Sequence, residues 1–332
     1  MRDPGRRRPS LYGNFARRHY SVALKNMGTK PPMSPAMEAM TVAKVNSPVQ
    51  RDRMTASGLI AKLAVYGIPT VVILCPMVLF LVSSFWSIRD GNLSREWTLE
   101  NYQKFLNDVS YWGVYFETIK LAGFVAIFGL VGGYVVAYLI WRQHGKLRYI
   151  LLLFSVIPLS MNYIVKIFAM RSILGFNGIL NGALIWAGII DAPSKIFVFN
   201  QTAVLISMSV IYLPFAILPI FLSLERIPPS LLEASADLGA SSGQTFWRVV
   251  FPMGLPGSIV GGLFVMVLAL GDFLTPQMVG GSQGFTFGRA IWSQFGMAFD
   301  WPFGAALAVM LLFAIAVILS LARVVTRSGR VS

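Results

Sequence analysis

The sequence predicts an all-α, polytopic membrane protein, and three observations support this fold class. First, hydrophobic residues make up 55% of the 332-residue chain and charged residues only 13%, whereas soluble domains carry about 25% charged residues. Second, several apolar runs reach the roughly 20 residues needed to cross a bilayer. Third, these runs are continuous and do not alternate with polar residues, which indicates helices and not a membrane barrel.

The apolar runs predict six transmembrane helices, and they divide the rest of the chain into a basic tail (1–57), a membrane domain (58–326) with one long polar loop (225–257), and a short C-terminal tail (327–332). The six spans are expected at about 59–87, 118–141, 149–170, 203–224, 258–278 and 303–325. Two shorter apolar stretches, 179–190 and 289–299, suit interfacial or re-entrant helices on the outer face.

The distribution of Lys and Arg predicts the orientation. With the N-terminus inside, 19 of the 28 basic residues lie on the inner side and six lie in outer loops. The positive-inside rule therefore places both termini and the 225–257 loop in the cytoplasm. The net charge of +14 follows this pattern and gives no reason to expect nucleic acid binding. The tail is predicted to be disordered; its charge fits attraction to anionic lipid, a topology anchor, or a start assigned too early.

The 225–257 loop carries the clearest local signals in the chain. Pro228-Pro229 predicts a helix start, and Gly239 predicts a left-handed residue at the end of that helix. Ser241 to Gln244 fits a capping box for a second helix, which Pro252 and Pro256 are expected to end before the fifth span.

The polar face of this predicted helix pair is acidic. Glu233 and Asp237 lie one turn apart and share a face, beside the small residues Ala234 and Ala240. Anionic lipid would repel such a face, so a helix that merely lies on the membrane is disfavoured. The loop is therefore predicted to dock on a protein partner.

Glu233-Ala234-Ser235, Gly239 and Pro252 resemble the E-A-A motif of the inner-membrane permease subunits of binding-protein-dependent ABC importers. That motif reads Glu-Ala-Ala, three residues, Gly, nine residues and Ile-x-Leu-Pro; Ser235, Val249 and Phe251 depart from it. The resemblance implies the type I ABC importer permease fold and a bacterial plasma membrane location. It implies that a separate ATP-binding subunit is coupled through Glu233, Ala234, Ser235, Asp237, Gly239, Ala240 and Pro252.

The resemblance also implies two further partners, which are a second permease subunit of paralogous sequence and a periplasmic or extracellular solute-binding protein. Within the family, the strings at 157–159, 173–178, 270–276, 279–282 and 300–304 resemble the spermidine/putrescine permeases. This implies a small cationic solute. Ferric iron, opines and amino-acid-like solutes are alternatives, because related permeases for these solutes share much of the same sequence.

Residues at membrane depth provide candidates for the solute pathway. Asp272 follows Gly271 in the fifth span and precedes Pro276; its carboxylate either attracts an oligoamine or caps a local helix break, and intramembrane acidic residues are functional candidates by default. Tyr212, Phe215 and Asn162 lie near proline breaks in the spans. They either contact solute or pack in the bundle. Lys166 is expected to snorkel outward.

Two other classes of function are weaker interpretations. A stand-alone secondary transporter would need several intramembrane carboxylates and an internal repeat, but only Asp272 stands out in the sequence. A membrane enzyme would need a metal-ligand cluster, a nucleophile motif or a histidine–carboxylate set, and the sequence predicts no catalytic residue, metal site or cofactor. The chain lacks G-x-x-x-x-G-K-[ST], so ATP is expected to act through the partner subunit.

Overall fold

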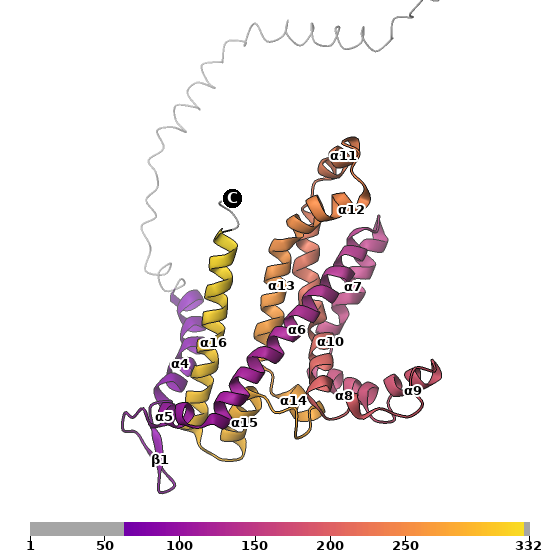
Figure 1. The fold of residues 1–332 in the computed structure, drawn as a ribbon. Coiled ribbons are helices and arrows are strands. Elements are labelled where there is room, and N and C mark those ends of the chain that lie inside the picture. Colours follow the sequence, from indigo (N-terminus) through magenta and orange to yellow (C-terminus); the bar gives the residue numbers. More distant parts are fainter. Residues whose placement is uncertain (1–62, 329–332) are drawn as a thin grey trace, which may run out of the picture. The chain divides into compact units, whose positions relative to one another are not determined.

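The computed structural model describes residues 63–328 (Figure 1), and the predicted tail 1–57 lies outside the described residues. The chain separates into two units between residues 71 and 72, inside helix α4 (Ile68–Ser83). The described part of the first unit is the π-helix η1 (Leu63–Gly67) and the start of α4. All remaining described elements belong to the second unit.

The second unit is helical apart from one small hairpin of two antiparallel strands. After α4 its elements are β1 (Ser87–Arg89), β2 (Asn92–Ser94), α5 (Glu100–Asn107), α6 (Val109–Trp141), α7 (Lys146–Ser160), α8 (Tyr163–Leu174), α9 (Ile179–Trp186), the 3-10 helix η2 (Lys195–Phe197), α10 (Gln201–Glu225), α11 (Pro229–Asp237), α12 (Ser242–Thr245), the π-helix η3 (Phe246–Val250), α13 (Phe251–Gly271), α14 (Leu274–Val279), α15 (Phe287–Gly296) and α16 (Trp301–Ser328).

Within residues 63–328, six segments are long and apolar enough to cross a membrane, the number that the sequence predicts. They are Val65–Ser83, Val109–Trp141, Tyr163–Trp186, Gln201–Glu225, Ser242–Gly271 and Trp301–Val324. The first predicted span ends earlier than expected, because the chain turns after Ser83 into the hairpin. Asn101 from α5 holds this turn with its side-chain amide, which donates to the carbonyl oxygens of Ser84 at 3.0 Å and Trp86 at 2.7 Å.

The third predicted span, 149–170, is wrong as a continuous helix. It is divided at Met161–Asn162 into α7 and α8. Pro158 lies in the last turn of α7, and Asn162 then caps α8 by accepting the backbone N–H of Ile164 at 2.9 Å. The segment that meets the length and hydropathy of a span here combines α8 with α9, although the 179–190 stretch was expected to lie outside the spans.

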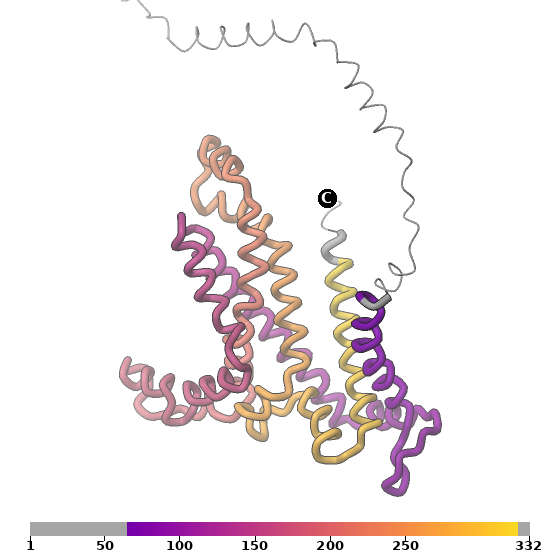
Figure 2. Tube along the Cα trace, turned by 180° about the vertical axis from the view of Figure 1, so that it is seen from behind, coloured from indigo at the N-terminus to yellow at the C-terminus, as the bar shows by residue number. Residues whose placement is uncertain are grey.

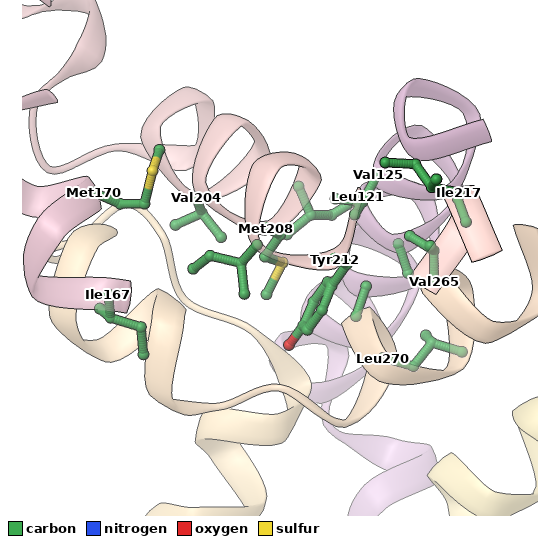
Figure 3. Close-up of a cluster of buried hydrophobic side chains, with 14 of the residues drawn as sticks. Leu121, Val125, Ile167, Met170, Val204, Met208, Tyr212, Ile217, Val265 and Leu270 are labelled. Atoms are coloured by element: carbon green, nitrogen blue, oxygen red, sulfur yellow. The ribbon is translucent and has the colours of Figure 1, made fainter. Parts of the chain in front are cut away.

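Helices α6, α10 and α13 pack along one another in both views (Figures 1 and 2). Their facing side chains form a buried apolar cluster, to which α8 also contributes (Figure 3). The labelled members of the cluster are Leu121, Val125, Ile167, Met170, Val204, Met208, Tyr212, Ile217, Val265 and Leu270.

Small residues let these three helices approach closely. A β-carbon added to Gly133 of α6 would lie 2.7 Å from the β-carbon of Ala216 in α10. One added to Gly257 of α13 would clash with the carbonyl oxygen of Pro219 and lie 2.5 Å from the Ser223 hydroxyl. Only glycine fits at such contacts, and backbones that pack this closely move together. We therefore treat α10 and α13 as one rigid pair.

The expectation that Pro252 and Pro256 end the second loop helix is wrong. The helical chain runs from α12 through η3 into α13, with Pro252 in the first turn of α13 and Pro256 inside it. The π-helical turn precedes Pro252, and its wider hydrogen bond runs from the Phe251 N–H to the carbonyl oxygen of Phe246. This local widening lets the chain pass the prolines without a break.

Candidate functional site

The 225–257 loop contains the two-helix element that its sequence predicts. Helix α11 begins at Pro229 and ends at Asp237, Leu238 is its C-cap, and Gly239 then adopts φ +75°. The N–H of Gly239 donates to the carbonyl oxygen of Ala236 at 2.9 Å, and the N–H of Ala240 donates to the carbonyl oxygen of Ser235 at 3.0 Å. This pair of bonds is the Schellman arrangement. A β-carbon on Gly239 would meet nothing within 4 Å, so glycine is needed here for its backbone conformation alone.

The second helix of the loop begins with the predicted capping box. The backbone N–H of Ser241 donates to the Gln244 side-chain oxygen at 2.8 Å, and the N–H of Gln244 donates to the Ser241 hydroxyl oxygen at 3.3 Å. The two helices are also joined through their side chains, because the hydroxyl oxygens of Ser235 and Thr245 lie 3.0 Å apart. Ser235, which departs from the motif, therefore links α11 to the end of α12.

Most of the predicted docking residues face outward. Glu233, Ala234, Asp237, Gly239 and Pro252 are exposed, and Ser235 and Ala240 are half-buried. Two large apolar side chains stand beside them, with Leu238 88% exposed and Trp247 64% exposed. The loop thus presents an acidic helix face next to uncovered apolar side chains, a combination that suits a protein partner better than water or anionic lipid.

The base of the loop is tied to α7. Glu225, the last residue of α10, lies 3.6 Å from the guanidinium of Arg148 and accepts the hydroxyl of Tyr149 at 3.3 Å. A displacement of the loop therefore acts on α7 as well as on α10 and α13.

Asp272 follows the last residue of α13, at the end of this helix away from the loop, and lies two residues before the start of α14. It is 7% exposed and sits where α13 stops and α14 begins. Its Oδ1 accepts the backbone N–H groups of Leu274 at 3.0 Å and Thr275 at 3.1 Å. The prediction that Asp272 caps a local helix break is therefore confirmed.

The second oxygen of Asp272 belongs to a cluster of hydroxyl groups, which we call the polar cluster (Tyr163, Tyr212, Asp272 and Thr275). Asp272 Oδ2 accepts the hydroxyls of Tyr163 at 2.6 Å and Tyr212 at 2.9 Å. The Tyr163 hydroxyl lies a further 2.7 Å from the Thr275 hydroxyl and 2.8 Å from that of Tyr212. The cluster joins α8, α10 and α14 to the end of α13.

A pocket of about 460 Å³ opens beside the polar cluster. Three of the four predicted pathway residues, Asp272, Tyr212 and Phe215, line it, together with Tyr163, Lys166, Val267, Leu268, Gly271, Phe273 and Leu274. Asn162 does not line it, because its side chain caps α8. Four aromatic side chains and one carboxylate in a single lining are a typical environment for an ammonium group.

The structure adds residues that the sequence analysis missed. Tyr163 and Thr275 complete the polar cluster, yet neither stands out in a local pattern. Lys166 lines the pocket, so the expectation that it snorkels away from the interior is wrong. Its ammonium nitrogen lies 5.5 Å from the centre of the Tyr163 ring. The only sequence signal for these residues was their closeness to Pro158 and Pro276.

In the described part of the chain, six apolar segments, an exposed two-helix loop and an open pocket beside a buried carboxylate are features of a membrane transport component. Residues 129–330 match the family described as binding-protein-dependent transport system inner membrane component. The chain belongs to this family, and it is therefore a multi-pass inner-membrane subunit of an ABC importer.

Curated relatives agree with this family. The spermidine/putrescine transport system permease protein PotB of Escherichia coli is 36% identical over 237 residues, which cover 71% of this chain and 86% of the relative. PotB of Haemophilus influenzae is 37% identical over 239 residues, with 71% and 82% covered. The inner membrane ABC transporter permease protein YdcU of Escherichia coli is 32% identical over 259 residues, with 74% and 82% covered.

Solved structures establish the fold. A chain of a bacterial ABC transporter involved in the import of the acidic polysaccharide alginate superposes with a TM-score of 0.66 at 15% identity, covering 88% of this chain and 99% of that chain. A chain of the MetNI methionine ABC transporter gives 0.50 at 18% identity, covering 64% and 93%. The predicted type I ABC importer permease fold is thus confirmed.

Proposed function

We propose that this chain is a permease subunit that carries spermidine or putrescine across the inner membrane, driven by a separate ATP-binding subunit. The solute is supported by the printed names of PotB relatives that match 71% of the chain at 35–37% identity. The pocket chemistry agrees, because spermidine and putrescine carry ammonium groups that aromatic faces and a carboxylate attract. Asp272 contributes mainly its charge, since four donors already occupy its oxygens.

One observation carries the mechanism: the closely packed pair α10 and α13 connects the exposed 225–257 loop directly to the pocket. Tyr212 lies on α10 and Asp272 at the end of α13, whose 21 residues span about 32 Å at 1.5 Å per residue. When nucleotide closes the ATP-binding subunits, the loop moves as a rigid body and the pair transmits that motion. The pocket then opens toward one side or the other.

In the proposed assembly, the other parts of the chain also have roles. Glu233, Ala234, Ser235, Asp237, Gly239, Ala240 and Pro252 contact the ATP-binding subunit. A second permease, paralogous to this chain, completes the pathway, and a solute-binding protein delivers solute from outside. Both termini lie in the cytoplasm, residues 58–326 form the permease domain, and the chain itself holds no nucleotide.

Uptake in cells tests this proposal. The complete system is expressed in a bacterial strain from which the native polyamine importers have been deleted, and entry of radiolabelled spermidine and putrescine is followed. We expect ATP-dependent uptake that disappears when this chain or the ATP-binding subunit is omitted. Normal growth and membrane insertion without any polyamine uptake would contradict the proposed solute.

One observation favours a second candidate solute. Lys166 in the pocket lining would pair with the carboxylate of an opine or amino-acid-like solute, while the aromatic rings and Asp272 accept its ammonium group. Under this alternative such a solute, added in excess, would be taken up and spermidine would not.

A further inference from the structure

The hydrogen-bonding capacity of Asp272 is already used within the protein. Oδ1 accepts two backbone N–H groups of α14, and Oδ2 accepts two tyrosine hydroxyls. A carboxylate offers about four acceptor positions, so an entering ammonium group finds none of them free. Its available partners in the pocket are the negative charge and the faces of the aromatic rings. Tyr163 and Tyr212 present such faces as a stacked pair, with ring centres 6.4 Å apart.

Lys166 already makes the contact that an ammonium-bearing solute would use. Its Nζ lies 5.5 Å from the centre of the Tyr163 ring, within the range of a cation–π interaction. The side chain is half-buried and lines the same pocket. None of the ion pairs in residues 63–328 includes Lys166. Its ammonium is therefore held by the aromatic face and not by a carboxylate partner.

We propose that Lys166 is a tethered competitor of the solute, whose ammonium group occupies the Tyr163 face until a solute ammonium displaces it. This inference rests on the proposed function, because it requires a solute that carries an ammonium group. The four-carbon stem of lysine is flexible, so the side chain swings aside and returns when the solute leaves. Lys166 thereby weakens solute binding and favours release, which sets the affinity of the pathway without contacting the solute.

Binding of radiolabelled spermidine to the complete permease–ATPase complex in nanodiscs, without the solute-binding protein, measures this competition. Lys166→Met removes the charge and keeps the length of the side chain. We expect the Kd of this variant for spermidine to fall roughly threefold to tenfold, because the solute no longer has to displace a cation–π contact, and such a contact has a free energy in this range. Lys166→Arg keeps the charge and stacks on aromatic rings, so its Kd should match or exceed that of the wild type.

Lys120→Met is the matched control. Lys120 is an exposed lysine of α6 that pairs with Glu117 at 2.8 Å and does not line the pocket, so its Kd should not change. An unchanged or higher Kd for Lys166→Met overturns the inference, and a higher Kd indicates instead that Lys166 contacts an anionic group of the ligand. Absence of binding to both the wild type and Lys166→Met also overturns it.

Cellular uptake separates the two proposals. If the wild type takes up spermidine but Lys166→Met binds it no more tightly, only the competitor role fails. If the wild type takes up neither polyamine, the proposed function fails and the competitor role fails with it.

Discussion

The 225–257 loop and the polar cluster lie at opposite ends of α13, and different kinds of contact hold each of them together. In the loop, the capping and Schellman bonds join residues at most five apart, and the Ser235–Thr245 contact joins residues ten apart. In the polar cluster, Tyr163 and Tyr212 are 109 and 60 residues away from Asp272. The loop is mostly exposed, whereas Asp272 is buried.

This difference assigns the two regions different mechanical behaviour. Local hydrogen bonds keep the loop in one shape while it moves as a body. The polar cluster depends on how α8, α10, α13 and α14 are placed, so any shift of these helices stretches contacts of 2.6–2.9 Å. A rigid surface at one end is thus connected to a readily altered site at the other. The following variants test this comparison, from the largest expected effect to the smallest.

Charge reversal at the loop should have the largest effect. Glu233→Lys places a positive charge on the exposed acidic face and should reduce uptake by about 100-fold or more, because a mismatched charge at an interface costs several kcal/mol. Gly239→Asp should reduce uptake for a different reason, because it places a side chain on a residue at φ +75° and strains the elbow. Membrane insertion should be normal. Glu117→Lys, an exposed reversal outside the loop, is the control. Full transport in both loop variants would contradict the docking role.

Gly257→Val should separate the two regions by disrupting the helix pair that connects them. The added side chain meets the Pro219 carbonyl and the Ser223 hydroxyl, and such overpacking costs about 1–3 kcal/mol or more. We expect a lower melting temperature in detergent and much less folded protein in the membrane. Gly123→Val on α6 is matched to it, because a β-carbon there meets nothing within 4 Å. Equal stability of the two variants would rule out the rigid pair.

Asp272→Asn should impair the pocket and leave the fold in place. Asparagine caps a helix about as well as aspartate, so α14 should still begin at Leu274. The negative charge is lost, and the amide NH₂ that replaces one oxygen cannot accept the hydroxyls of Tyr163 and Tyr212. We expect solute transport to fall roughly tenfold to 100-fold at unchanged protein level. Asp108→Asn provides the comparison, since Asp108 caps α6 through the Ser110 N–H at 2.8 Å and lies outside the pocket. Unchanged uptake by Asp272→Asn would show that Asp272 only caps the helix and takes no part in transport.

Ser235→Ala should have the smallest effect. The substitution removes the contact with Thr245, which should lower the stability of the loop by about 1 kcal/mol. It also restores the alanine of the E-A-A motif, so the docking surface should keep its shape. Uptake should change by roughly threefold or less, and hydrogen exchange in α11 should speed up. Ser209→Ala, which loses only a bond to the Leu205 carbonyl within α10, should show no change in that exchange. A large loss of uptake would show that the contact with the ATP-binding subunit needs the hydroxyl group of Ser235 and not only a small side chain.

The sequence by itself determined the all-α membrane class, the number of spanning segments and the caps within the 225–257 loop, but not the bounds of the third span or the end of the second loop helix. These features depend on short-range physics. The length of an apolar run decides whether it spans a bilayer, and Gly239 and the Ser241–Gln244 box act on backbone groups a few residues away.

Only the tertiary structure decided the rest. Tyr163 and Lys166 of α8 line the same pocket as Asp272 because helices far apart in the chain pack together, and no local sequence pattern predicts which residues of such helices meet. Two local features also differ from the prediction. Asn162 caps a new helix and does not line the pocket, and the π-helical turn before Pro252 lets the helix continue past this proline. Periodicity reports which residues face inward, but packing alone determines which of them meet.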